Sequence, residues 1–218
     1  SFYEKVQKNI PDINDYEKIA DTGRVGENYS QSRYILDLQK DIKKLNNDQQ
    51  VFWNNINNIF SSSEFWTTIS TKFKNTIAER FKFLTEEEKK ILGEKPKIFF
   101  KSQLIKDFTK YELEVHTDSP RKLISFLFYL PKNDDLKEIG TALYAPKDIL
   151  KDEDAKLYHF SKEQTVNFFT KVKTCEFKKN SVLVFPRTNY SYHGVEKVNI
   201  NQKERNLFFA NFYAEKSN

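Results

Sequence analysis

The chain has 218 residues, enough for one domain with a full hydrophobic core, and its 15% aromatic content with few glycines and prolines argues against disorder. One cysteine excludes an intramolecular disulfide framework, no apolar run approaches membrane-spanning length, and the polar first segment lacks an apolar signal core, so we expect a cytoplasmic protein. The net charge of +5 could attract an anionic partner, but 36 Lys and Arg residues are mixed with 31 Asp and Glu residues along the whole chain. We therefore expect a small-molecule substrate rather than nucleic acid or a membrane, and the sequence leaves the oligomeric state open.

Residues 1–95 are predicted to be mainly helical. A short helix is expected from Asp12 to Ala20, and Tyr34-Ile35-Leu36 has the pattern of a short strand. The stretch from Thr22 to Ser32 holds two of the five glycines and is predicted to be a loop.

Three further helical patterns follow before residue 95. Asp48 can cap a helix with one apolar face, and a second apolar stripe that recurs every four residues predicts one long helix. Thr85-Glu86-Glu87-Glu88 is a capping-box signature that starts another short helix. The apolar positions of the first helix are Phe52, Ile56, Ile59 and Phe60, and those of the long helix are Phe65, Ile69, Phe73, Ile77 and Phe81.

Residues 96–218 change to short β-type runs separated by turn signals. Seven such runs without intervening helical periods predict a β-sandwich or jelly roll, with the helices of residues 1–95 as its support in a single domain spanning 1–218. The runs are Ile98 to Leu104, Tyr111 to His116, Leu123 to Leu130, Thr141 to Tyr144, Ser181 to Phe185, Tyr192 to Val198 and Leu207 to Tyr213.

Two of the three histidines stand in a pattern that binds metal. His116 and Asp118 end one β-type run, and His193 opens another about 75 residues later. Side chains at positions i and i+2 of a strand share a face, so His116 and Asp118 can be two ligands of one ion, with His193 arriving from a different strand. Two imidazoles and one carboxylate form the facial triad that holds non-haem Fe(II) and leaves positions open. His159 lacks such a context and is predicted to be an ordinary surface or core residue.

Arg205 follows His193 by 12 residues, across a predicted turn at Asn199 to Gln202. We expect that hairpin to place Arg205 on the strand next to His193, several ångströms from the metal, which suits a small dicarboxylate because Arg pairs with carboxylates in bidentate fashion. The alternative is a surface salt bridge with Glu204 or Glu196. The residues predicted to share the face of Arg205 are Leu207, Phe209, Asn211 and Tyr213.

Residues 102–213 resemble the 2-oxoglutarate-dependent Fe(II) oxygenases. The resemblance lies in the order and spacing of the H-x-D motif at His116 to Asp118, the later Ser191-Tyr192-His193-Gly194-Val195, and Arg205-Asn206-Leu207. It implies a mainly β, double-stranded β-helix fold (a cupin-like jelly roll) buttressed by α-helices. It also implies that His116, Asp118 and His193 are the catalytic metal ligands and that Arg205 binds the distal carboxylate of 2-oxoglutarate. Side chains that could help to hold the cosubstrate are Tyr111, Tyr129, Thr141, Tyr144 and Asn211, with Gln103 and Lys106 as weaker candidates.

The function implied by this resemblance is hydroxylation of a C–H bond in a small polar or sugar-like substrate. It uses Fe(II), 2-oxoglutarate as cosubstrate and O2, with ascorbate as a candidate reductant, and gives succinate and CO2 as co-products. Asp118 favours hydroxylation over halogenation, because a carboxylate stands where halogenases of this kind leave room for chloride. The alternatives are a non-catalytic, cupin-like carbohydrate-binding module, or an oxygenase of the same superfamily that acts on nucleic acid or protein. The candidate substrate loops are Thr22 to Ser32, Asn133 to Ile139 and Ala145 to Asp154.

Overall fold

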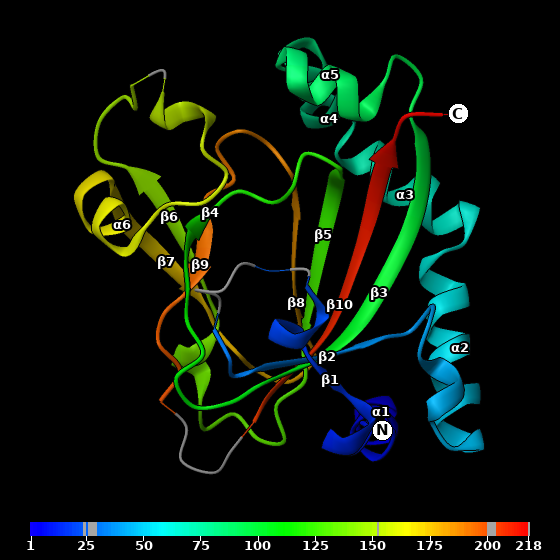
Figure 1. Cartoon of the computed structure of the whole chain (residues 1–218). Coiled ribbons are helices and arrows are strands. Elements are labelled where there is room, and N and C mark those ends of the chain that lie inside the picture. Colours follow the sequence, from blue (N-terminus) through cyan, green and yellow to red (C-terminus); the bar gives the residue numbers. More distant parts are fainter. Residues whose placement is uncertain (24, 26–29, 152, 200–203, 218) are drawn as a thin grey trace.

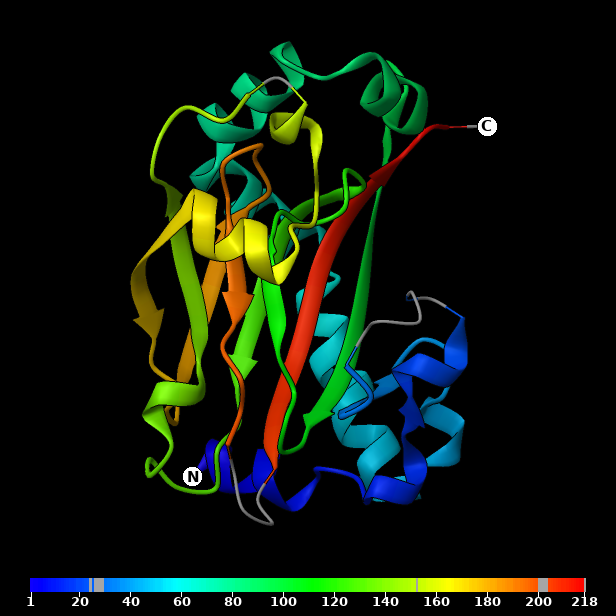
Figure 2. The ribbon, with the colours of Figure 1, turned by 60° about the vertical axis from the view of Figure 1, so that its left-hand side comes forward.

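Two antiparallel sheets face each other, and helices cover the outer face of the larger one (Figure 1, Figure 2). This computed structural model describes residues 1–23, 25, 30–151, 153–199 and 204–217. The main sheet has the order β1-β2-β3-β10-β5-β8, and the smaller sheet has the order β4-β9-β6-β7. The main-sheet strands are β1 (Glu17–Lys18), β2 (Arg33–Asp37), β3 (Lys97–Asp107), β5 (Lys122–Tyr129), β8 (Ser181–Pro186) and β10 (Arg205–Glu215). Those of the smaller sheet are β4 (Leu113–His116), β6 (Thr141–Pro146), β7 (Phe169–Cys175) and β9 (His193–Val195).

From β3 onwards the chain passes back and forth between the two sheets. Strands β3, β5, β8 and β10 belong to the main sheet, while β4, β6, β7 and β9 belong to the smaller one. This winding is that of a double-stranded β-helix, so the predicted jelly-roll fold is confirmed. One consequence matters for the site: except for β6 and β7, strands that follow each other in this part of the chain lie on opposite walls of the space between the sheets.

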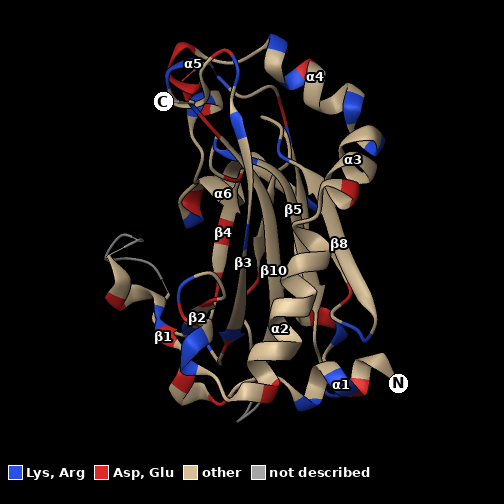
Figure 3. Ribbon diagram, turned by 90° about the vertical axis from the view of Figure 1, so that its right-hand side faces the viewer, with Lys and Arg blue, Asp and Glu red and all other residues tan. Residues whose placement is uncertain are grey.

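The helices lie outside this sandwich. The longest, α2 (Asn47–Phe60), and the next, α3 (Ser63–Lys72), run along the outer face of the main sheet, and α2 has few charged residues there (Figure 3). Alternate residues of β10 point to that face, and the rings of Phe208 and Trp53 lie 5.6 Å apart between centroids. The other α-helices are α1 (Phe2–Lys8), α4 (Lys74–Lys82), α5 (Glu86–Leu92) and α6 (Lys162–Phe168).

The prediction of a helix from Asp12 to Ala20 is wrong. Two short 3-10 helices, Ile13–Asp15 and Ile19–Thr22, flank strand β1, which pairs with β2 at the edge of the main sheet. The backbone groups of this segment find their partners in a sheet edge, which outweighs a weak local helical pattern.

The predicted long helix is interrupted at Phe73, where the backbone angles (φ −105°, ψ 14°) leave the helical range and α3 gives way to α4. The apolar stripe continues through the break, because its residues still pack against the main core. The cap of α2 is Asn46 rather than Asp48, which lies in the first turn. The capping box of Thr85 and Glu88 is confirmed.

Strand β7 had no place in the sequence prediction. Its side chains are mostly exposed because it is an edge strand of the smaller sheet, so it has no alternating apolar pattern to detect. The predicted loop from Thr22 to Ser32 and the predicted turn at Asn199 to Gln202 fall partly on residues 24, 26–29 and 200–202, which lie outside the described residues.

Strands β1 and β2 come from the first 95 residues yet lie in the main sheet, and α2 and α3 share its core. A single domain spanning 1–218 therefore stays our proposal. No described helix is both long enough and apolar enough to cross a membrane.

Candidate metal centre and its cavity

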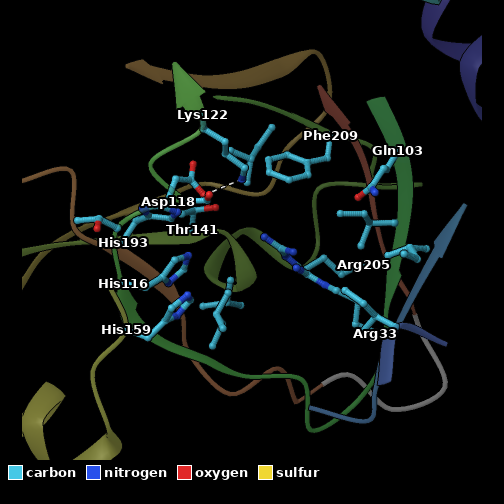
Figure 4. A pocket seen from close by; sticks show the side chains of 18 residues that line it. Arg33, Gln103, His116, Asp118, Lys122, Thr141, His159, His193, Arg205 and Phe209 are labelled. Carbon is cyan, nitrogen blue, oxygen red and sulfur yellow. Dashed lines mark hydrogen bonds and ion pairs between the residues drawn. The ribbon is translucent and has the colours of Figure 1, made fainter. Parts of the chain in front are cut away.

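His116 and His193 lie directly opposite each other on the paired strands β4 and β9. This pairing is close because the next residue is Gly194: a Cβ atom there would come within 2.7 Å of the Leu113 carbonyl oxygen. Asp118 follows two residues after His116, and the possible ligand atoms of these three buried side chains lie within 4.8 Å of one another (Figure 4). The residues predicted to share one metal are therefore together in space.

Both imidazoles are held in the tautomer that a metal requires. Nδ1 of His116 lies 2.9 Å from the Glu114 carbonyl oxygen, and Nδ1 of His193 lies 2.9 Å from that of Ser191. A carbonyl can only accept, so each Nδ1 donates its proton and each Nε2 keeps a free lone pair. Burial, reinforced by the neighbouring His193, lowers the pKa of His116 well below its usual value, and burial also lowers the pKa of His193. Two neutral imidazoles are thus available as ligands.

Asp118 is the anionic member of the group, and both of its oxygens are engaged. Lys122 Nζ lies 2.6 Å from Oδ1, and the Ser125 hydroxyl donates to Oδ2 at 2.5 Å. Burial alone would raise the pKa of Asp118, but the ammonium of Lys122, which also hydrogen-bonds to the carboxylate, holds this pKa well below its usual range. The carboxylate is therefore ionised and fixed in orientation.

Two buried arginines hold the backbone of the 118–122 loop, which carries Asp118. Arg187 donates from Nε to the Asp118 carbonyl at 3.2 Å, while Arg80 on α4 donates to the carbonyls of Pro120 and, at 2.7 Å, Lys122. Glu88 on α5 accepts from Arg187 at 2.7 Å, and its other oxygen completes the capping box of that helix. The helices of the first 95 residues thus help to position a candidate metal ligand.

Arg205 faces the same cavity from the opposite wall, and the predicted hairpin with His193 is wrong. β10 pairs with β3 and β5 in the main sheet, whereas β9 belongs to the smaller sheet, because consecutive strands alternate between the sheets. The guanidinium of Arg205 is fully buried, donating from Nη1 to Asp107 at 2.7 Å and from Nε to the Ile139 carbonyl at 2.7 Å. Its Nη2 has no partner among the described residues. The predicted alternative, a surface salt bridge with Glu204 or Glu196, does not occur.

The cavity between the sheets has a volume of about 260 Å³. Its lining includes the metal-ligand candidates, Arg205 and a second arginine, Arg33. Arg33 donates to the carboxylate of Asp107 from Nε at 2.6 Å and from Nη2 at 2.8 Å, so it shares this carboxylate with Arg205. Figure 4 shows the histidines on one side and the arginines on another. The apolar part of the lining consists of Ile19, Ile35, Ile105, Leu113, Leu127, Val195 and Phe209.

The side chains predicted to assist 2-oxoglutarate differ in their placement. Thr141 lines the cavity, and Tyr129 reaches it only through a hydroxyl that donates to Thr141 Oγ1 at 2.9 Å. The remaining three are not in the lining: Tyr111 is fully buried beneath the Arg33 guanidinium, Tyr144 packs near Val115, and Asn211 is buried with an unpartnered Oδ1. A direct role for those three stays a prediction without support from geometry.

Of the two weaker candidates, Gln103 lines the cavity, whereas Lys106 bonds to Glu204 at 2.8 Å and is not in the lining. Sequence reasoning missed three lining residues with charged or titratable side chains: Arg33, Lys122 and His159. The ring of His159 stacks on that of His116, 5.0 Å away and 7° from parallel. Nothing in the local sequence signals this contact, because it arises where an irregular segment crosses β4.

No protein-family model and no curated protein matches this sequence. Among solved structures, the chain is similar to an oxidoreductase of the 2OG-Fe(II) oxygenase family from Burkholderia pseudomallei, with 12% identity, a TM-score of 0.49 and coverage of 97% of this chain and 77% of that one. It is also similar to a prolyl-4-hydroxylase from Pseudomonas putida, with 10% identity, a TM-score of 0.48 and coverage of 99% and 83%. A third structure, EvdO2 from Micromonospora carbonacea in complex with 2-oxoglutarate, gives 11% identity, a TM-score of 0.42 and coverage of 98% and 81%. At these values the functional assignment depends on the geometry of this chain alone.

Proposed function

We propose that this protein is a 2-oxoglutarate- and Fe(II)-dependent oxygenase that hydroxylates a C–H bond of a small polar substrate. The observation that carries the proposal is the convergence of His116, Asp118 and His193, with ligand atoms within 4.8 Å, in a cavity that Arg205 enters from the facing sheet. Three ligands of this kind hold a divalent ion on one side and leave its other positions open.

The donor set fits Fe(II). Two neutral imidazoles present Nε2, and an ionised carboxylate completes the triad. The Nδ1 bonds to backbone carbonyls orient both rings, as outer hydrogen bonds do in metal sites generally. When bound, Fe(II) and 2-oxoglutarate supply the activation of O2 that oxidises the substrate C–H bond, with succinate and CO2 as co-products.

Arg205 fits the distal carboxylate of 2-oxoglutarate. A buried N–H without a partner costs free energy, and Nη2 of Arg205, a residue of the cavity lining, is such a group among the described residues. Asp107 and the Ile139 carbonyl fix the other side of the guanidinium, so the free N–H has a defined direction. Thr141 offers a hydroxyl on the same cavity.

The remaining lining residues separate the reaction from water. Leu113, Leu127 and Val195 form apolar walls from both sheets, which strengthens the charged interactions inside. The cavity volume of about 260 Å³ suits a compact ligand rather than a wide one. This favours a small substrate over a duplex nucleic acid.

Metal titration and cosubstrate turnover test the proposal. The protein should bind one Co(II) or Fe(II) per chain, and with Fe(II), O2 and ascorbate it should release succinate from 2-oxoglutarate slowly even without substrate. His116→Ala and Asp118→Ala should each abolish metal binding. His159→Ala is the matched control, since it removes the third histidine and should keep the stoichiometry.

If one metal ion still binds after His116 and Asp118 are both replaced, the assignment is wrong. If metal binds but 2-oxoglutarate is never consumed, the non-catalytic cupin-like alternative takes its place.

A further inference from the structure

Lys122 is the cationic side chain nearest to the candidate metal ligands. Its side chain is 12% exposed, its ammonium lies 2.6 Å from Asp118 Oδ1, and it sits over the ring of Phe209, 4.4 Å from the centroid. Within the described part of the chain, Asp118 is the only carboxylate in contact with it. Asp118 is therefore the one carboxylate that balances the positive charge of Lys122 in this part of the chain.

That partner is the carboxylate required by the metal of the proposed function, on which this inference rests. Ser125 already donates to Oδ2 of Asp118, and Lys122 occupies Oδ1. A divalent ion held by the triad would draw on the same single negative charge. One carboxylate cannot balance an ion and an ammonium together, so Lys122 would be left in the cavity without a full counter-charge.

The distal carboxylate of 2-oxoglutarate does not provide this counter-charge, because the proposed function assigns it to Arg205. The keto-acid carboxylate that would lie at the metal brings the negative charges, with that of Asp118, only to two, against the three positive charges of the ion and the ammonium. Arg205 and Phe209 lie four residues apart on the same face of β10, a separation of roughly 13 Å along a strand. Figure 4 shows Lys122 and Phe209 together at one end of the cavity and Arg205 away from them. The cavity thus has two separate cationic positions, and the metal-ligand candidates line the wall opposite β10.

We propose that the substrate carries a carboxylate and that Lys122 is the residue that pairs with it. Phe209 lies under the ammonium and offers an apolar face to the body of the substrate. Gln103, directly opposite Phe209 on β3, adds an amide that can hydrogen-bond beside the carboxylate. A carboxylate anchored here places the neighbouring carbons of a small molecule toward the metal position. The substrate class is therefore a small carboxylic acid.

Benzoate and benzamide form a matched probe pair, because they share shape and differ in charge. Their binding is measured by calorimetry in low-chloride buffer on protein saturated with Co(II) and 2-oxoglutarate under nitrogen. We expect benzoate to bind at least roughly tenfold more tightly than benzamide. Lys122→Gln should remove this preference and Lys122→Arg should retain it. Lys173→Gln, which makes the same change on an exposed strand, should leave the preference unchanged.

The inference is overturned by equal affinities for the two probes, by an undiminished preference in Lys122→Gln, or by displacement of 2-oxoglutarate by benzoate. A Lys122→Gln protein that loses 2-oxoglutarate affinity by the same factor would instead assign Lys122 to the cosubstrate, which also overturns it. Loss of metal or 2-oxoglutarate binding in the unmodified protein would be a failure of the proposed function, and it is measured first. Circular dichroism and the ratio of the two affinities keep a folding defect in Lys122→Gln from being mistaken for loss of recognition.

Discussion

Two groups of arginines, three of them buried and Arg33 partly exposed, lie around the candidate metal centre, and they use their hydrogen bonds differently. Arg205 and Arg33 share the carboxylate of Asp107 at the cavity wall, and Arg205 keeps an unpaired Nη2. Arg187 and Arg80 lie behind the 118–122 loop and donate chiefly to backbone carbonyls and to Glu88.

The comparison teaches that burial of a cation does not by itself mark a ligand site. Burial and the nearby Arg187 lower the pKa of Arg80 to about 10, yet both of its Nη atoms are bound to the chain and only Nε is unpartnered. Arg80 therefore fixes the backbone of the 118–122 loop. Arg205 is also buried, but it lines a cavity that holds three metal-ligand candidates, and its Nη2 has no partner among the described residues. Whether a buried arginine positions the chain or binds a ligand therefore depends on which atoms accept its hydrogen bonds, and not on how deeply its side chain is buried.

The largest effect should come from removing the only carboxylate of the loop-holding group. Glu88→Ala leaves the guanidinium of Arg187 buried without a charged partner, and we expect a loss of about 3–5 kcal/mol in the free energy of unfolding. Urea denaturation measures it. Glu88→Gln should lose less, because an amide can still accept the helix-capping bond from Thr85.

Glu87→Ala is the matched control for Glu88, since it is the neighbouring glutamate on the same helix and is exposed. Its effect should stay within about 0.5 kcal/mol. Equal effects of the two alanine variants would contradict the structural role given to the Arg187 group.

Replacing Arg205, which lines the cavity, should affect ligand binding more than the stability of the fold. Arg205→Met should weaken 2-oxoglutarate binding by about 2–5 kcal/mol, or roughly 30-fold and more, because the cosubstrate carboxylate loses its charged partner. Asp107 keeps Arg33 as a counter-ion, so the fold should persist. Calorimetry on the Co(II)-loaded protein measures the affinity, and a Co(II) affinity altered along with it would show that the two groups are not separable.

The sequence was enough to predict the metal-ligand candidates, because the H-x-D motif places two ligand residues two positions apart. The expected shared strand face does not explain their meeting, since β4 ends at His116 and Asp118 lies in the loop that follows. It was also enough for the jelly roll, because β5 and β10 are mostly buried and β3 is buried in its second half, so their sequences carry a clear apolar pattern. The placement of Arg205 could not be predicted correctly. A local hairpin is the simplest connection, but the double winding sends successive strands to opposite sheets.

The carboxylate partners of Arg205 and Arg187 could not be predicted from the sequence for a related reason. Arg205 and Asp107 are 98 residues apart in the chain, and Arg187 and Glu88 are 99 apart. No local pattern links residues at such distances; only the register of β10 against β3 brings the first pair together. His159 and Lys122 were missed because their significance lies in contacts with His116 and Asp118 and not in their own surroundings in the sequence.

A smaller effect is expected from Arg80. Arg80→Met removes the donors to two backbone carbonyls of the 118–122 loop, at a cost of about 1–3 kcal/mol in the free energy of unfolding. Because the loop carries Asp118, the visible spectrum of bound Co(II) should change as well. Arg205→Met should leave that spectrum unaltered before 2-oxoglutarate is added. A spectrum that changes in Arg205→Met but not in Arg80→Met would reverse the roles assigned to the two groups.

The most gradual effect is a pH dependence of the free energy of unfolding, which comes from the imidazoles of His116 and His193. The pKa values of His116 and His193 are lowered in the folded protein, so below about pH 6.5 the unfolded chain takes up protons that the folded one does not. The metal-free protein should therefore lose stability as the pH falls from about 6.5, by at most about 1.4 kcal/mol per pH unit for each histidine. Asp118 acts in the same direction at lower pH, because its depressed pKa stabilises the fold only while it is ionised. Urea denaturation between pH 7.5 and 5 in the unmodified protein and in His116→Asn/His193→Asn measures the slope. An equal slope in the double variant would show that other groups, and not these two imidazoles, respond to acid.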